Sequence, residues 1–111
     1  MKTIGDEVMF AVGEPRTAAA TALALAGDFA RDGLRVRIGM AWGPTVPYEG
    51  DLFGPTVNLA SRLVHLARPG AVIVDQPLGV ELARDPAFAL RRLRPRLKGL
   101  GRVRAWVLRS R

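Results

Sequence analysis

The side chains of Asn58 and Arg62 are the first candidates for chemistry in this sequence. They lie four residues apart in a segment expected to be helical, so they share one face and can converge on a single point. An amide and a guanidinium placed together can orient a bound molecule and donate to its polar oxygens. Taken singly, however, the two residues also fit a solvated helix face, and Asp6 after Gly5 also fits a turn. These residues, considered one at a time, therefore do not identify a reaction or a ligand.

Four motifs that occur in a fixed order are more specific. They are K-T-I-G-D at residues 2–6, the run G-D-L-F-G-P-T-V-N-L-A-S-R-L at 50–63, A-R-P-G at 67–70 and L-K-G at 97–99. This order resembles the catalytic domain of class III nucleotide cyclases, most closely the bacterial, class IIIc-like adenylate cyclases with a G-D-x-F-G-x-x-V-N signature. The central run is long and specific, K-T-I-G-D supports it, and L-K-G alone would be weak. The resemblance extends along the whole chain, which is interpreted as one partial cyclase domain, residues 1–111.

The resemblance implies an adenylate cyclase, a phosphorus–oxygen lyase that converts ATP to 3′,5′-cyclic AMP and pyrophosphate. Lys2 and Asp51 are similar to the pair that recognises the base. Adenine offers an N1 acceptor and an N6 donor, which suit a cation and an anion, whereas guanine reverses that pattern. Asp6 is similar to one of two aspartates that hold two Mg²⁺ or Mn²⁺ ions, and a carboxylate suits a hard cation. One ion would activate the ribose 3′-hydroxyl, and the other would bind the triphosphate.

Three further positions match the residues that hold the reacting nucleotide in the family. Asn58 resembles the asparagine that orients the ribose, and Arg62 resembles the arginine that stabilises the transition state. A planar fork of donors can follow the charge that is redistributed over the α-phosphate oxygens. Lys98 resembles the lysine that binds the β- and γ-phosphates as a point charge.

Local signals predict the elements that must position these residues. A helix is indicated by Pro15, the alanine-rich stretch that follows it and the stop at Asp32–Gly33. A strand with one buried face is indicated by the alternation of Leu34, Val36, Ile38 and Met40 with other residues. The expected strands cover residues 6–12, 34–40, 71–75, 88–97 and 102–109, with helices at 15–31, 55–67 and 78–84, a hairpin in 45–53 and a tight turn at 98–101. Element order alone predicts an α/β sandwich with its helices on one face of the sheet.

The resemblance implies an α/β (α+β), ferredoxin-like nucleotide cyclase fold that is N-terminally truncated. The first strand, the helices after it and most of the next strand would be absent, together with the F-x-D motif that carries the family's first metal aspartate. We expect the strands over 6–12 and 34–42 to flank the position of that first strand, which would leave an open seam of unpaired backbone groups. We therefore expect the chain alone not to cyclise ATP. A cropped fragment, a start site assigned too late and a genuine remnant all stay open, and the intact downstream residues favour part of an active enzyme.

Composition and charge narrow the class of protein. Hydrophobic residues make up 49% and charged residues 24%, which is typical of a globular protein, and the absence of cysteine excludes a disulfide scaffold and a cysteine nucleophile. No apolar run is long enough to span a membrane, so we expect a cytoplasmic protein. The net charge is +7, and the segment 91–111 holds eight arginines and Lys98 with no acid. A basic C-terminal segment of this kind can bind nucleic acid, anionic lipid or a polyphosphate ligand, and its charge alone does not distinguish among these partners.

The resemblance also implies a head-to-tail homodimer with composite ATP sites, because family members draw the base and metal groups from one subunit and the asparagine and arginine from the other. One alternative is a noncatalytic cyclase homologue that dimerises with a complete cyclase and regulates it. A second alternative is an RNA-binding α/β domain with basic strands. Aromatic residues make up only 6% of the chain, and the closing strands lack aromatic pairs for base stacking, so this alternative is weak.

Overall fold

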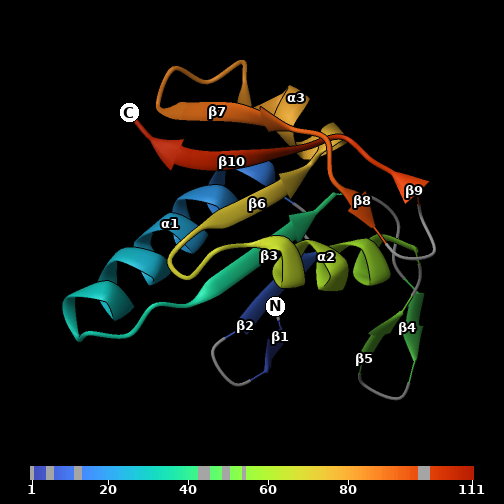
Figure 1. Ribbon diagram of the computed structural model, residues 1–111, viewed down its shortest axis with the longest axis horizontal. Helices are drawn as coiled ribbons and strands as arrows, with labels where there is room; N and C mark the ends of the chain where they lie inside the picture. Colours follow the sequence, from blue (N-terminus) through green and yellow to red (C-terminus); the bar gives the residue numbers. More distant parts are fainter. Residues whose placement is uncertain are drawn as a thin grey trace.

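The protein folds around one mixed β-sheet flanked by helices (Figure 1). The computed structural model describes the backbone of residues 2–4, 7–11, 14–42, 46–48, 51–53, 55–97 and 101–111, and the side chains of 14–42, 59–97 and 101–111. The elements are β1 (Lys2–Ile4), β2 (Glu7–Ala11), α1 (Pro15–Arg31), β3 (Arg37–Ala41), β4 (Val46–Tyr48), β5 (Asp51–Phe53), α2 (Pro55–Leu66), β6 (Val72–Asp75), α3 (Gln76–Leu82), β7 (Phe88–Leu93), β8 (Arg96–Leu97), β9 (Gly101–Arg102) and β10 (Ala105–Ser110). The main sheet has the order β1-β2-β3-β6-β10-β7, and β4–β5 and β8–β9 form two separate pairs.

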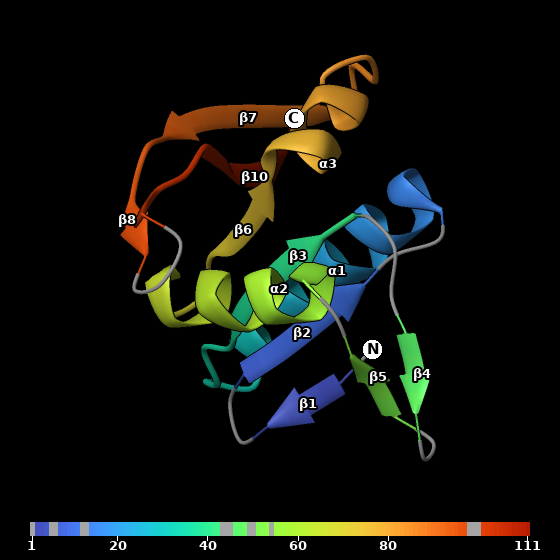
Figure 2. The ribbon, with the colours of Figure 1, turned by 90° about the vertical axis from the view of Figure 1, so that its right-hand side faces the viewer.

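Helices cover both faces of this sheet, so the prediction of helices on one face was wrong. On one face, Ile38 and Met40 pack in the same core as the buried alanines of α1 and the leucines of α3. On the other face, the neighbouring Ala41 packs against α2. The alternation in the sequence suggested a single buried face because Gly39 has no side chain, yet Gly39 is itself buried beneath α2. Figure 2 shows the two layers, with α2 in front of the sheet and α1 behind it.

The strands β2 and β3 pair directly, which corrects the expectation of an open seam between them. They run parallel, in a register that extends from Glu7 opposite Arg37 to Ala11 opposite Ala41. Parallel neighbours need a long connection, and α1 supplies it. Direct pairing gives the backbone groups of both strands hydrogen-bonding partners, which removes the cost that an open edge inside the sheet would carry.

The helices follow the local signals in the sequence. The Glu14 side chain accepts the backbone N–H of Arg16 at 2.9 Å and caps α1, whose first residue is Pro15. The spacing of Ala19, Ala22 and Ala26 places all three in the core. The predicted helix that starts at Pro55 is confirmed as α2, and the short helix predicted at 78–84 is α3. No helix in the part of the chain that the structure describes is long and apolar enough to cross a membrane.

The strands agree less closely with their predicted bounds. The strand expected from Leu34 begins at Arg37, and Leu34 is 57% exposed. The predicted hairpin is confirmed by the pairing of Tyr48 with Asp51, whereas β1 was not predicted. The two long closing strands are divided into β7, β8, β9 and β10, because Pro95 lacks the N–H that would continue the ladder. The turn predicted at 98–101 lies mostly outside the described residues, and Gly101 has a φ of 71°, a conformation that favours glycine.

Candidate active site

The helix α2 carries the central part of the candidate site, and its orientation is fixed by its apolar side. Ala60, Leu63, Val64 and Ala67 are buried at the spacing of one helix face. A Cβ atom at position 39 would collide with the Ala60 carbonyl oxygen and the Val64 backbone nitrogen, so the α2 backbone lies directly on β3. This close approach determines which residues of α2 face the sheet and which face away from it.

Arg62 lies on the side of α2 that is turned away from the sheet. Its side chain is half-buried, and its Nε atom is buried without a hydrogen-bond partner in the part of the chain that the structure describes. A buried donor without an acceptor costs about 1–3 kcal/mol, more when the group is charged, so native proteins rarely keep one without a reason. Position 58 lies one turn earlier on the same side of the helix. This side of α2 therefore carries a guanidinium whose hydrogen-bonding capacity is not fully used within the described residues.

The elements that carry Lys2 and Asp51, the residues expected to recognise the base, lie near α2. Lys2 lies in β1, opposite Met9 of β2, and Asp51 lies in β5, opposite Tyr48. The helix α2 packs against both β2 and β5, so the fold brings these elements to one side of the molecule, as Figure 2 shows. For Lys2, Asp51 and Asn58 the structure describes the backbone, and Asp6 and Lys98 lie outside the described residues. The convergence of all six side chains on one nucleotide therefore stays a prediction.

A metal site is not formed by the residues that the structure describes. Within them, no three histidine, aspartate or glutamate side chains lie close enough together to hold an ion. Asp6, the residue with a metal role by resemblance, lies outside them.

Asp75 is a buried carboxylate that the sequence analysis did not single out. It is only 3% exposed, and it caps α3 by accepting the backbone N–H of Leu78 at 3.1 Å. Its burial raises its pKa from 3.8 to about 6, although its backbone hydrogen bonds act in the opposite direction. The signal was present, since an aspartate that follows an apolar strand and precedes Gln76–Pro77 is a typical helix cap. The role of Asp75 in the fold is to join β6 to α3.

With this geometry described, the family can be assigned. The model of the adenylate and guanylate cyclase catalytic domain matches residues 1–110. The chain belongs to this cyclase family. Over 92 residues it is 41% identical to an adenylate cyclase of Glutamicibacter nicotianae, and over 86 residues it is 45% identical to one of Streptomyces coelicolor. These alignments cover 81% and 76% of this chain, but only 23% of each relative.

Solved cyclase structures share the fold. An adenylate/guanylate cyclase/hydrolase from Silicibacter pomeroyi aligns with 87% of this chain and 63% of its own length, with a TM-score of 0.72 and 23% identity. The catalytic core of a rhodopsin-guanylyl cyclase with converted specificity, in complex with ATPαS, aligns with 87% of this chain and 59% of its own length, with a TM-score of 0.75 and 22% identity. The mixed α+β architecture is therefore that of a cyclase domain.

Proposed function

We propose that this chain carries the nucleotide-handling residues of an adenylate cyclase, which converts ATP to 3′,5′-cyclic AMP and pyrophosphate. The observation that carries the proposal is the buried Nε of Arg62, which has no partner in the described residues and lies in the signature helix of the family. The relatives named as adenylate cyclases favour ATP as the substrate. The expected adenine-recognising pair, Lys2 and Asp51, favours it as well.

In the proposed reaction, the ribose 3′-oxygen attacks the α-phosphorus and pyrophosphate leaves. Arg62 donates to the α-phosphate oxygens, where charge is redistributed in the transition state. Asn58 orients the ribose so that the 3′-oxygen and the leaving group lie in line. Lys98 neutralises the β- and γ-phosphates, which makes pyrophosphate a better leaving group. Binding, orientation and charge stabilisation are thus the work of the chain's own residues.

Two Mg²⁺ or Mn²⁺ ions complete the proposed site, and bound ions would make the 3′-hydroxyl more acidic. Asp6 is the aspartate that this chain offers to them. The F-x-D motif of the other metal aspartate does not occur in the 111 residues. We therefore propose that residues 1–111 alone do not turn over ATP and that a partner must supply the metal groups.

A head-to-tail dimer provides this arrangement. Arg62 and position 58 lie on the side of α2 that is turned away from their own sheet. A second subunit can present its base- and metal-binding groups to this side. In a homodimer of complete domains that include the F-x-D motif, each subunit would contribute both halves, which gives two composite ATP sites.

Complementation of an inactive partner tests this proposal. The partner is a complete cyclase domain of the same family whose arginine at the position equivalent to Arg62 has been replaced by alanine. We expect residues 1–111 to restore cyclic AMP formation from ATP with Mn²⁺, because the chain supplies the arginine to the partner's metal site. The Arg62→Ala chain is the matched control and should restore nothing.

The outcomes separate the proposed function from its alternative. Restoration by both chains, or by neither, would contradict the catalytic role of Arg62. A chain that restores nothing but changes the rate of an unmodified complete cyclase would instead support the noncatalytic, regulatory homologue.

A further inference from the structure

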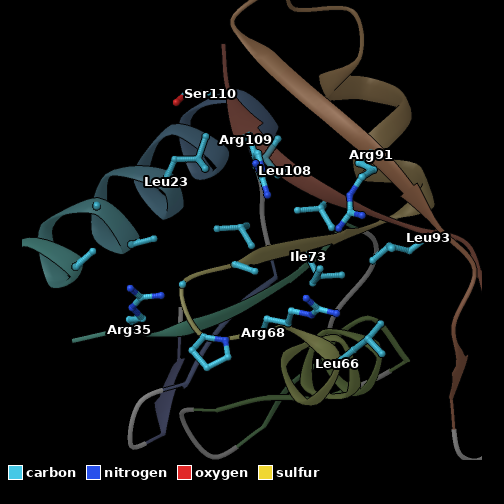
Figure 3. Close-up of a pocket in the computed structure, with 18 of the residues that line it drawn as sticks. Leu23, Arg35, Leu66, Arg68, Ile73, Arg91, Leu93, Leu108, Arg109 and Ser110 are labelled. Atoms are coloured by element: carbon cyan, nitrogen blue, oxygen red, sulfur yellow. The ribbon is translucent and has the colours of Figure 1, made fainter. Parts of the chain in front are cut away.

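A hollow of about 1160 Å³ lies away from the candidate active-site residues, at one end of the sheet. It is lined by the C-terminal half of α1, the turn after α2, and the neighbouring strands β6, β10 and β7, as Figure 3 shows. The apolar part of its lining comes from Ile73 and Val107, which are opposite each other in the sheet, and from neighbouring aliphatic side chains. Among the described residues that line this hollow, none is a candidate site residue.

Positive charge dominates the lining. The arginines that line the hollow are Arg35, Arg68, Arg91, Arg94 and Arg109. All of them are exposed, and no described aspartate or glutamate lines the hollow with them. Among the described residues, the observed ion pairs use other arginines, such as Arg16 with Asp85 and Arg31 with Asp28. The guanidinium groups of the hollow are thus available to an external anion.

The strand register concentrates this charge at one place. Arg91 lies opposite Val107, and Arg109 is two residues further along β10, so both arginines are on the same face of the sheet. Such diagonal neighbours are about 7–8 Å apart, a distance that long side chains bridge. Figure 3 shows Arg68 and Arg91 pointing toward one another from opposite sides of Ile73. Like charges held this close repel one another, and an anion between them removes that cost.

The chemistry of the lining indicates the class of ligand. Guanidinium groups bind phosphate oxygens through two parallel hydrogen bonds, and several of them around one hollow suit several phosphate groups. The volume is near the range typical of small-molecule sites. Among the residues described around the hollow there is no aromatic side chain, and therefore no stacking platform of the kind that single-stranded nucleic acid uses. The lining is also concave, which suits a compact ligand better than a membrane surface.

We propose that this arginine-lined hollow binds a small, soluble anion that carries several phosphate groups. The ligand is held mainly by Arg68, Arg91 and Arg109, and Arg35 and Arg94 are further donors in the lining. The site is distinct from the proposed cyclase site, because the two share none of the described residues.

Isothermal titration calorimetry with inorganic tripolyphosphate, at about 0.15 M salt to screen nonspecific attraction, tests the proposal. The Arg91→Gln/Arg109→Gln chain should bind at least about tenfold more weakly than the wild-type chain, because it loses two charge-assisted contacts. The matched control is Arg102→Gln/Arg104→Gln, which removes the same charge from exposed arginines outside the hollow and should leave the affinity within about twofold. An Arg62→Ala/Lys98→Ala chain should also bind normally, which excludes binding at the candidate active site.

A second pair, Arg35→Gln/Arg68→Gln, repeats the test from the other wall of the hollow and protects the result against a folding defect in the first pair. Equal weakening by the control pair, or unchanged binding in both hollow variants, would overturn the proposal. Anionic vesicles of phosphatidylserine and phosphatidylcholine, and a single-stranded oligonucleotide, complete the comparison. Binding to either of these through the hollow arginines, without binding of tripolyphosphate, would also overturn it and assign the hollow to a membrane or to nucleic acid.

Discussion

The carboxylate of Asp75 accepts the backbone N–H of Trp42 at 3.2 Å and so links the end of β3 to the start of α3. Its other oxygen accepts the N–H of Leu78. One buried side chain thus satisfies two backbone donors at the junction of three elements. Burial and hydrogen bonding oppose each other at this carboxyl group, and burial dominates, because its pKa is raised to about 6.

This raised pKa predicts a pH dependence of stability. Between pH 3.8 and about 6 the folded chain holds a proton on Asp75 that the unfolded chain has lost, so this contribution to stability falls as the pH rises through that window. Relative to an Asp75→Asn chain, the wild-type free energy of unfolding should therefore decrease across the window, by on the order of 3 kcal/mol in total. Urea unfolding of both chains at several pH values measures this difference. Parallel pH profiles, or a wild-type chain that gains stability over the variant as the pH rises, would contradict it.

The contact between Gly39 and α2 predicts a second effect on stability. A Gly39→Ala chain must move the α2 backbone, because the added methyl group would overlap the Ala60 carbonyl and the Val64 nitrogen. We expect a loss of about 1–3 kcal/mol in the free energy of unfolding, measured by urea denaturation. Gly27→Ala is the matched control, since Gly27 lies inside α1 with nothing within 4 Å of the added atom. That variant should gain about 0.5–1 kcal/mol, and a similar loss in both chains would contradict the role of Gly39.

The sequence predicted those parts of the fold that depend on local signals. Pro15, the alanine spacing and the Asp32–Gly33 stop define α1 without reference to any other element. The second buried face of β3 depends on how closely α2 approaches Gly39, and glycine has no side chain from which this could be inferred. The direct pairing of β2 with β3 joins segments that are far apart in the chain. Such nonlocal choices are not encoded in periodicity.

For the candidate site, too, the local features could be predicted from the sequence and the tertiary contacts could not. The four-residue spacing of Asn58 and Arg62 predicted one helix face, and the confirmed helix α2 places both positions on its outer side. The half-burial of Arg62, and the lack of a partner for its Nε among the described residues, could not be predicted from that spacing, because both depend on tertiary packing. The spacing of residues in the sequence does not predict where Lys2, Asp6, Asp51 and Lys98 lie relative to α2. Their roles came from the ordered motifs, and a composite site would in addition require a second chain.

Base selectivity provides a prediction for Lys2. If Lys2 donates to N1 of adenine, a Lys2→Glu chain should offer an acceptor where adenine also has one, whereas guanine has a donor there. The enzyme for this test is a homodimer of a complete cyclase domain that contains residues 1–111 together with the F-x-D motif. Its ratio of kcat/KM for ATP to kcat/KM for GTP should fall by about tenfold or more, because a buried polar mismatch is costly. Lys98→Gln is the control, since it weakens triphosphate binding for both nucleotides and should leave the ratio nearly unchanged. An unchanged ratio in the Lys2→Glu enzyme would remove Lys2 from base recognition.

The kinetics of Arg62 variants provide the most direct test of the transition-state role. In the same complete domain, Arg62→Ala should lower kcat by roughly 10²–10³ with a smaller effect on KM, because the lost donor acts mainly on charge that develops during the reaction. Arg62→Lys keeps the charge but loses the planar fork, so its kcat should lie between those of the wild-type and alanine enzymes. Arg104→Ala, at an exposed arginine outside α2, should leave both constants nearly unchanged. A rise in KM at constant kcat would instead show that Arg62 binds the ground state and the transition state equally, and the assigned role would then be wrong.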